Sequence, residues 1–264
     1  MENVERNNRF RILVCIDGED EGYRCLQYAT RMGGDREDCD IVLLHVRPID
    51  QGLATGGLQV RLARENILNW GLDLPGIRYL KKGLSMLVKE KEMDVEWTSE
   101  MFHSDVEGDP LGDNKIEYRH HSGRRIVLKL KTAPDVASGV LDQYELGPYN
   151  VIMLGSEVSG RSRLRSALAP RTSEKVALHA PCSVFICRDL VAGNGHLVCI
   201  DGTPKSFEAA KLEAQIASRF PKPNLSAVCV VTEKSMVGEA ESIIRRLEHV
   251  LTSELDFNLK GTYV

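Results

Sequence analysis

The sequence predicts an α/β fold, a doubly wound five-stranded parallel sheet followed by a partial second copy of the same pattern. Two observations predict it. Short β-branched apolar runs alternate with amphipathic stretches along the first 190 residues, and the letters LVCIDG occur twice, at 13–18 and 197–202. Such alternation is typical of parallel strands joined by right-handed crossover helices, and the repeated letters indicate an internal duplication.

Five buried strands are expected in the first domain, because each apolar run is short and bounded by turn residues. These runs are RILVCI (11–16), IVLLHV (41–46), IVLKLK (126–131), VIMLG (151–155) and SVFICR (183–188). Helices are expected where apolar residues recur at helical spacing, or where a proline suits a first helical turn. They cover about 21–32, 59–70, 76–92, 134–144 and 170–179.

The domain organisation follows from where this pattern stops and restarts. The first domain covers 1–190, and the stretch VAGNG (191–195) serves as a linker. Residues 191–264 then repeat strand, helix, strand, helix and a short last strand, which amounts to half a domain. Residues 94–124 fit neither copy, since they begin acidic and end basic, and we expect an inserted β-hairpin with its turn at GDPLGDN (108–114).

The composition excludes several classes of protein. Hydrophobic residues make up 42% of the 264 residues and charged residues 27%, as in ordinary globular proteins. The formal net charge of −4 favours neither nucleic acid nor an anionic membrane. No apolar run approaches the roughly 20 residues of a membrane-spanning helix, and the polar start MENVERNNRF lacks the apolar core of a signal peptide. Seven cysteines without a CxxC motif indicate reduced thiols, so we expect a cytoplasmic protein. From the charge and the lack of long apolar runs, we expect that it binds neither nucleic acid nor a membrane.

A ligand site is expected beyond the carboxyl ends of the strands, at the point where the strand order reverses. That point places Asp17, the 47–57 loop and the loop after Leu154 around one crevice. The stretch 155–188 leaves a buried strand through a glycine-bearing loop and enters a helix, which offers free N–H groups and the positive end of a helix dipole. The arginines that would add positive charge for a phosphate are Arg161, Arg163, Arg165 and Arg171. A solvated basic loop without a ligand is the alternative.

The letters LGSEVSGRSRLRSALAPRTSEKVALHAPCSVFICR (154–188) resemble the C-terminal signature of the universal stress protein family, above all SEKV followed by HAPC and a final apolar strand. RILVCIDG and IVLLHV are similar to the first two strands of that family. The resemblance covers most of 10–190 outside the insertion, and LVCIDG through about 257 resembles the first half of a second domain. It implies an adenine-nucleotide alpha-hydrolase-like fold, often paired through its last strand, in which some members bind ATP.

Members that bind ATP share a loop of the form Gly-x2-Gly-x9-Gly-Ser/Thr, with an Asp near the adenosine at the end of the first strand. The nucleotide-binding residues expected here are Asp17, Val46, Gly155, Gly160, Arg161, Arg163 and Arg171. The loop departs from the family pattern, because Pro170-Arg171 replaces Gly-Ser/Thr and four residues rather than two separate Gly155 from Gly160. Since proline lacks an N–H donor, the resemblance implies a degenerate site for ATP or another adenine nucleotide, or no cofactor at all.

Asp201 repeats Asp17 in the second copy, but no phosphate loop follows it within the chain. Both residues also have a purely structural interpretation, as Asp-Gly turns that end a strand. His45 lies within an apolar strand and is expected to be a core histidine with its hydrogen bonds satisfied.

The histidines of the insertion are candidate metal ligands. His103, His120 and His121 would meet a metal together with Asp105 only if the hairpin gathered them. We interpret them as exposed polar residues and expect no metal.

The sequence therefore predicts a non-catalytic protein of the universal stress type, active in stress response or regulation, with a degenerate nucleotide crevice in its first domain. No catalytic residue is assigned, since the chain has neither a GxxxxGK[ST] loop nor a GxSxG elbow. Two alternatives are slow ATP hydrolysis in the same crevice and a nucleotide-free protein-interaction module. We expect a homodimer or an intramolecular pseudo-dimer through the edge strand 183–188, and an unidentified regulatory protein partner.

Overall fold

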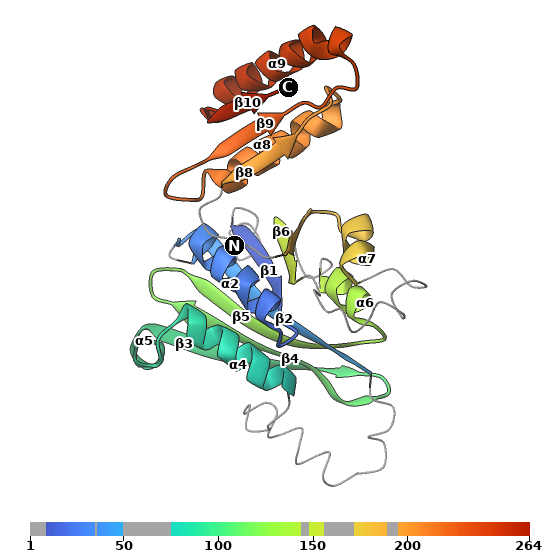
Figure 1. The fold of residues 1–264 in the computed structure, drawn as a ribbon. Helices are drawn as coiled ribbons and strands as arrows, with labels where there is room; N and C mark the ends of the chain where they lie inside the picture. Colours follow the sequence, from blue (N-terminus) through green and yellow to red (C-terminus); the bar gives the residue numbers. More distant parts are fainter. Residues whose placement is uncertain (1–8, 35, 50–74, 144–147, 156–171, 189–194) are drawn as a thin grey trace. The chain divides into compact units, whose positions relative to one another are not determined.

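The computed structural model describes residues 9–34, 36–49, 75–143, 148–155, 172–188 and 195–264 (Figure 1). Contacts within the chain divide it into two compact units, Met1–Leu190 and Val191–Val264. None of the described helices is long and apolar enough to cross a membrane.

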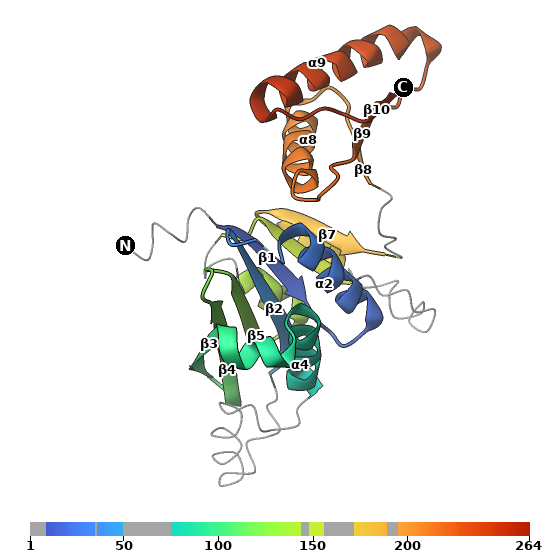
Figure 2. The same cartoon turned by 90° about the vertical axis from the view of Figure 1, so that its left-hand side faces the viewer.

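A seven-stranded sheet forms the centre of the first unit, with the strand order β3-β4-β5-β2-β1-β6-β7 (Figures 1 and 2). Its strands are β1 (Phe10–Cys15), β2 (Cys39–Pro48), β3 (Trp97–Val106), β4 (Asp109–His120), β5 (Arg125–Ala133), β6 (Val151–Gly155) and β7 (Ser183–Cys187). The strands β5-β2-β1-β6-β7 run parallel to one another, which confirms the predicted five-stranded parallel sheet. β3 and β4 add an antiparallel hairpin beside β5, so the whole sheet is larger than predicted.

Helices cover both faces of this sheet, as a doubly wound fold requires. Leu43 of β2 lies against Gly83 in α4, whereas Val46 points to the opposite face and lies against Gly139 in α6. The helices of the first unit are α2 (Asp20–Gly33), α4 (Pro75–Leu87), α5 (Glu90–Glu96), α6 (Val136–Leu141) and α7 (Thr172–His179).

Three helices differ from their predicted extents. The helix predicted at 76–92 is two helices, because the extended backbone of Lys89 separates α4 from α5. The helix predicted from Pro134 begins later, since the carboxylate of Asp135 caps it by accepting hydrogen bonds from N–H groups of its first turn. The helix predicted at 59–70 lies outside the described residues, as do the first two residues of the one predicted at 170–179.

The insertion forms the predicted hairpin, but its turn lies at a different position. β3 and β4 remain paired as far as Val106 and Asp109, which leaves Glu107 and Gly108 as the turn, with Gly108 at a φ of +78°. The letters GDPLGDN (108–114), predicted as the turn, belong to β4 except for the first glycine.

Asp109 explains this difference, because its side chain is occupied inside the fold rather than in a turn. Its carboxylate forms an ion pair with Arg47 of β2. It also accepts hydrogen bonds from the N–H groups of Leu111 at 2.9 Å and Gly112 at 3.0 Å. The side chain of Asp109 is fully buried and that of Arg47 is 14% exposed. A buried carboxylate needs such partners, and here they fasten the hairpin to the parallel part of the sheet.

A three-stranded parallel sheet with the order β10-β9-β8 forms the second unit. Its elements are β8 (His196–Cys199), α8 (Pro204–Ala217), β9 (Leu225–Val228), the 3-10 helix η3 (Lys234–Met236), α9 (Val237–Leu255) and β10 (Gly261–Tyr263). Phe207 of α8, Leu225 of β9 and Leu247 of α9 belong to one buried core. The unit therefore has its own apolar core, and its strand order resembles that of β5-β2-β1.

The two copies of LVCIDG have the same local structure. Gly18 and Gly202 have φ values of +98° and +84°, a conformation that glycine adopts readily. Oδ1 of the preceding aspartate, Asp17 or Asp201, accepts a hydrogen bond of 3.0 Å from the N–H two residues further on. Both copies thus end a strand in an Asp-Gly turn stabilised by the aspartate side chain.

Asp109→Ala is expected to destabilise the first unit by about 3 kcal/mol, because it leaves the largely buried guanidinium of Arg47 without its carboxylate. Urea unfolding followed by circular dichroism measures the change. Glu107→Ala, at the exposed turn of the same hairpin, is the control and is expected to change the free energy of unfolding by less than about 0.5 kcal/mol. Equal stability of Asp109→Ala and the wild type would contradict the anchoring role of this ion pair.

Candidate functional site

The predicted crevice lies at the carboxyl ends of β1, β2 and β6. The chain runs from β1 to β2 and β5 on one side of the sheet and returns to β6 and β7 on the other, so β1 and β6 are neighbours where the direction reverses. Doubly wound sheets bind their ligands at such a switch point. Asp17 follows β1 and Gly155 ends β6, so both lie at this point.

Asp17 and Gly155 both approach the first turn of α2. A Cβ atom on Gly22 would lie 3.0 Å from Oδ1 of Asp17, and a Cβ atom on Gly155 would lie 2.9 Å from the backbone nitrogen of Gly22. The structure thus brings together two of the predicted site residues. It also gives Gly155 a packing role, since a side chain there would press against the backbone of α2.

Glu21 adds a second carboxylate to this place. Its Oε1 pairs with Arg24 at 2.6 Å, while its Oε2 is buried and accepts no hydrogen bond from the described residues. Leaving a buried acceptor unsatisfied costs free energy, so this oxygen is suited to a ligand's hydroxyl or N–H group. Sequence reasoning missed Glu21, because acidic residues are common in the first turn of any helix.

Val46 lies near the carboxyl end of β2, with its side chain in the core. Its side chain is 9% exposed and lies against Gly139 of α6 and near Ala133 of β5. Its register partner in β5 is Lys131. The side chain of Val46 therefore belongs to the core, and a ligand in the crevice would meet its backbone at most.

The other predicted site residues lie outside the described part of the chain. They are Gly160, Arg161, Arg163 and Arg171, together with Arg165 and Pro170. The described half of the crevice is the half in which the resemblance places the adenosine.

Tyr79 covers the Asp17-Gly18 turn from the side of α4. A Cβ atom on Gly18 would lie 2.5 Å from the ring of Tyr79, and this ring stands 5.5 Å from that of His45. Nδ1 of His45 is 2.6 Å from the carbonyl oxygen of Ile16, and burial lowers the pKa of His45. His45 is thus a core histidine with a hydrogen-bond partner, as predicted. Sequence reasoning missed Tyr79, because one tyrosine in an amphipathic helix forms no motif.

The histidines of the insertion do not gather as one group. Nε2 of His103 lies 3.5 Å from Asp105, while Nε2 of His120 lies 2.8 Å from Oε2 of Glu96. Ligand atoms of Glu96, His120 and His121 lie within 4.8 Å of one another. Two histidines are therefore joined by Glu96, which sequence reasoning did not single out, instead of by Asp105.

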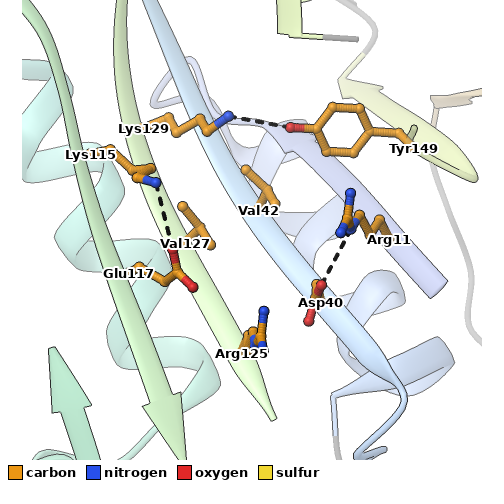
Figure 3. A pocket seen from close by; sticks show the side chains of 9 residues that line it. All are labelled: Arg11, Asp40, Val42, Lys115, Glu117, Arg125, Val127, Lys129 and Tyr149. Atoms are coloured by element: carbon orange, nitrogen blue, oxygen red, sulfur yellow. Dashed lines mark hydrogen bonds and ion pairs between the residues drawn. The ribbon is translucent and has the colours of Figure 1, made fainter. Parts of the chain in front are cut away.

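A charged hollow of about 100 Å³ lies on the sheet between β1, β2, β5 and β4 (Figure 3). Val42 and Val127, which are register partners, supply its apolar lining. The other residues that line it are Arg11, Asp40, Lys115, Glu117, Arg125, Lys129 and Tyr149. No motif marks this hollow in the sequence, because its residues come from four strands and a loop.

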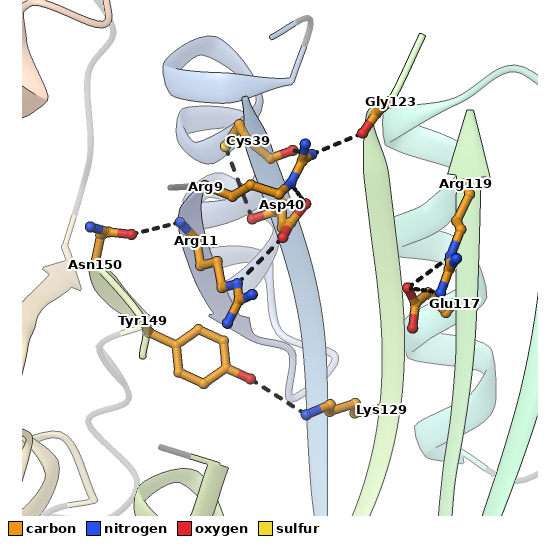
Figure 4. Close-up of polar contacts among 10 residues, drawn as sticks. All are labelled: Arg9, Arg11, Cys39, Asp40, Glu117, Arg119, Gly123, Lys129, Tyr149 and Asn150. Atoms are coloured by element: carbon orange, nitrogen blue, oxygen red, sulfur yellow. Dashed lines mark hydrogen bonds and ion pairs between the residues drawn. The ribbon is translucent and has the colours of Figure 1, made fainter. Parts of the chain in front are cut away.

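The hollow is separate from the crevice. Arg11 and Asp40 are the second residues of β1 and β2, and Arg125 is the first residue of β5, so the hollow lies toward the amino ends of these strands. Its two carboxylates are held by cations (Figure 4). The ion pairs are Arg9–Asp40 at 2.6 Å, Arg11–Asp40 at 3.4 Å, Lys115–Glu117 at 3.5 Å and Arg119–Glu117 at 3.0 Å.

No protein-family model and no curated protein matches the sequence. Several solved structures are similar to it. A functionally unknown protein from Pseudomonas aeruginosa PAO1 is 15% identical with a TM-score of 0.50, and the match covers 99% of this chain and 76% of that one. The universal stress protein UspA from Lactobacillus plantarum is 17% identical with a TM-score of 0.38, over 69% of this chain and 99% of that one. A universal stress protein in complex with cAMP is 10% identical with a TM-score of 0.41, over 69% of this chain and 98% of that one.

At these identities the likeness concerns the fold alone. The first unit has the strand order β5-β2-β1-β6-β7 with helices on both faces, which is the doubly wound arrangement that the resemblance implied. The chain therefore has a mixed α/β fold with a large, mostly parallel central sheet, and it shares this fold with the protein from Pseudomonas aeruginosa PAO1.

Proposed function

We propose that this chain is a non-catalytic protein of the universal stress type, with a role in stress response or regulation, whose crevice binds an adenine nucleotide. The observation that carries the proposal is the meeting of Asp17 and Gly155 at the start of α2, at the switch point of the sheet. The carboxylate of Asp17 is exposed there.

The chemistry of the described half of the crevice suits an adenosine. Oδ1 of Asp17 is held by its own turn, which orients the carboxylate and leaves its other oxygen to accept a hydrogen bond from a ribose hydroxyl. Oε2 of Glu21 is a second acceptor in the same place, and it is buried. The first turn of α2 adds N–H groups at the positive end of a helix dipole.

The same contacts favour binding over hydrolysis. An attacking water needs a base that is free and aligned with it. Oδ1 of Asp17 is held by its turn and Oε1 of Glu21 by Arg24, so both carboxylates are fixed as acceptors for a ligand rather than aligned on a water. We therefore expect nucleotide occupancy to control association with a partner protein rather than to drive turnover.

Asp17→Ala is expected to weaken the binding of Mg-ATP at least about tenfold, because it removes a charged hydrogen-bond acceptor for the ribose. Isothermal titration calorimetry measures the affinity. Asp201→Ala is the matched control, since Asp201 forms the same Asp-Gly turn in the second unit, and it is expected to leave the affinity unchanged.

The same preparations separate the proposal from its alternatives. Phosphate release by the wild type that disappears in Asp17→Ala would replace it with slow ATP hydrolysis. Absence of binding by the wild type to ATP, ADP, AMP and cAMP would replace it with a nucleotide-free interaction module.

We also propose that the chain forms a homodimer through residues 183–188. β7 is the last strand in the order of the sheet, and Ile186 within it is 43% exposed. An edge strand with free backbone groups and an exposed apolar side chain is a template for pairing with another strand.

Ile186→Lys is expected to convert the dimer to a monomer, because a charged side chain opposes pairing at a sheet edge. Light scattering coupled to size exclusion measures the mass. Leu178→Lys changes an even more exposed leucine, 77% exposed on α7, and is expected to leave the dimer intact. A wild-type monomer, or a dimer that survives Ile186→Lys, would rule out this interface.

A further inference from the structure

Like charges face each other across β4 and β5. The antiparallel register places Lys115 directly opposite Lys129, and Arg119 directly opposite Arg125. Like charges in directly opposed positions destabilise an antiparallel pair of strands. Two such pairs, with Glu117 between them, give this face of the sheet an excess of positive charge.

The carboxylates of the hollow do not neutralise this excess. Asp40 is already engaged by two arginines, and Glu117 by the side chains two positions before and after it in β4. Within the described residues, neither Lys129 nor Arg125 forms an ion pair with a carboxylate. These two cations therefore face the hollow without a carboxylate in direct contact within the described residues, and only the more distant charges of Asp113 and Glu117 act on Lys129 and Arg125.

Lys129 is hydrogen-bonded to neutral groups instead, and Figures 3 and 4 show one of them, the hydroxyl of Tyr149. Its Nζ donates to Oε1 of Gln143 at 3.1 Å and to the hydroxyl of Tyr149 at 3.4 Å. Neutral acceptors hold an ammonium group in place, but they satisfy a partly buried charge less well than an anion does.

We propose that this hollow binds a small multivalent oxyanion of the phosphate class, held by Lys115, Lys129 and Arg125 above Val42 and Val127. Ammonium and guanidinium groups are the usual protein partners of phosphate oxygens. An anion placed there would give a counter-charge to Lys115 and Lys129 of one like-charge pair and to Arg125 of the other. This function is additional to nucleotide binding, because the hollow and the crevice lie toward opposite ends of the same strands.

The dimensions of the hollow restrict the size of the ligand. Its volume of about 100 Å³ is well below the roughly 300–1,000 Å³ of pockets for drug-sized ligands. Lys129 and Arg125 lie four residues apart on one face of β5, so their Cα atoms are about 13 Å apart at roughly 3.3 Å per residue. Long side chains can converge over that distance on a ligand with two charged groups, and pyrophosphate is the probe of choice.

Pyrophosphate is expected to raise the Tm of the wild-type protein in a saturable manner at constant ionic strength. Lys129→Met keeps the aliphatic stem and removes the charge. We expect it to weaken pyrophosphate binding about tenfold or more, because a charge-assisted contact is lost, and to raise the Tm without ligand, because a like-charge pair is relieved. A purely structural lysine would give neither the loss of binding nor the gain in Tm.

Two controls make the result decisive. Lys91→Met removes a lysine that is exposed on α5 and is expected to change neither quantity. Asp17→Ala is expected to retain the response to pyrophosphate, which separates the hollow from the crevice. Arg125→Gln provides a second test should Lys129→Met fail to fold. A response that is absent in the wild type, or equal in the wild type and Arg125→Gln, overturns the proposal.

The pH dependence of stability gives an independent readout on the same lysine. Burial, followed by the charges of Lys115, Lys131 and Arg11, lowers the pKa of Lys129 from 10.5 to about 8, against the opposite effect of Asp113. Between these values the unfolded chain binds more protons at this site than the folded chain, so the contribution of Lys129 to stability rises with pH.

Without ligand, the wild type is expected to gain stability relative to Lys129→Met as the pH rises from 8 to 10.5. Chemical unfolding of both proteins at several pH values measures the difference, and other titrating groups cancel in it. Pyrophosphate affinity is expected to fall over the same range as Lys129 loses its proton. Parallel stability curves for the two proteins would show that Lys129 is not held among uncompensated cations.

Discussion

β5 joins the parallel strands of the first unit to the inserted hairpin, so the size of the sheet depends on it. It also supplies charged side chains to the polar face of that sheet. Its alternate residues from Ile126 to Leu130 are buried, whereas the residues between them, such as Lys129, are only partly buried. A strand that is apolar on one face needs cover on that face alone. α4 and α6 both contact β5, and the part of the polar face that lines the hollow is left to polar groups and to whatever binds them.

The inserted hairpin meets this requirement only in part. β4 pairs with the edge of β5, and the ion pair between Arg47 and Asp109 fixes the hairpin to β2. β4 brings Glu117 to the polar face as a counter-charge, but the same register brings Lys115 opposite Lys129. The pairing of β4 with β5 thus stabilises the hairpin and, at the same time, places cations opposite each other. A bound anion would offset the repulsion between those cations.

Much of the fold could be predicted from the sequence, because apolar runs and Asp-Gly turns are local signals. The crevice was predictable in part: Asp17 and Gly155 end strands, and parallel strands bring their carboxyl ends together. Tyr79 was not, since only the packing of α4 brings it to the Asp17-Gly18 turn, and Glu21 was not, since acidic residues are common in the first turn of any helix. The hollow could not be predicted from the sequence, because the β4–β5 register decides which cations lie opposite each other. That register is set by a turn after His120 that no sequence pattern indicated.

Anomalous diffraction from crystals soaked in selenate shows directly whether an anion occupies the hollow. We expect an anomalous peak above Val127, placed so that a selenate oxygen lies within hydrogen-bond distance of Nζ of Lys129. Peaks found only elsewhere on the protein, with the hollow holding nothing but water, would contradict it.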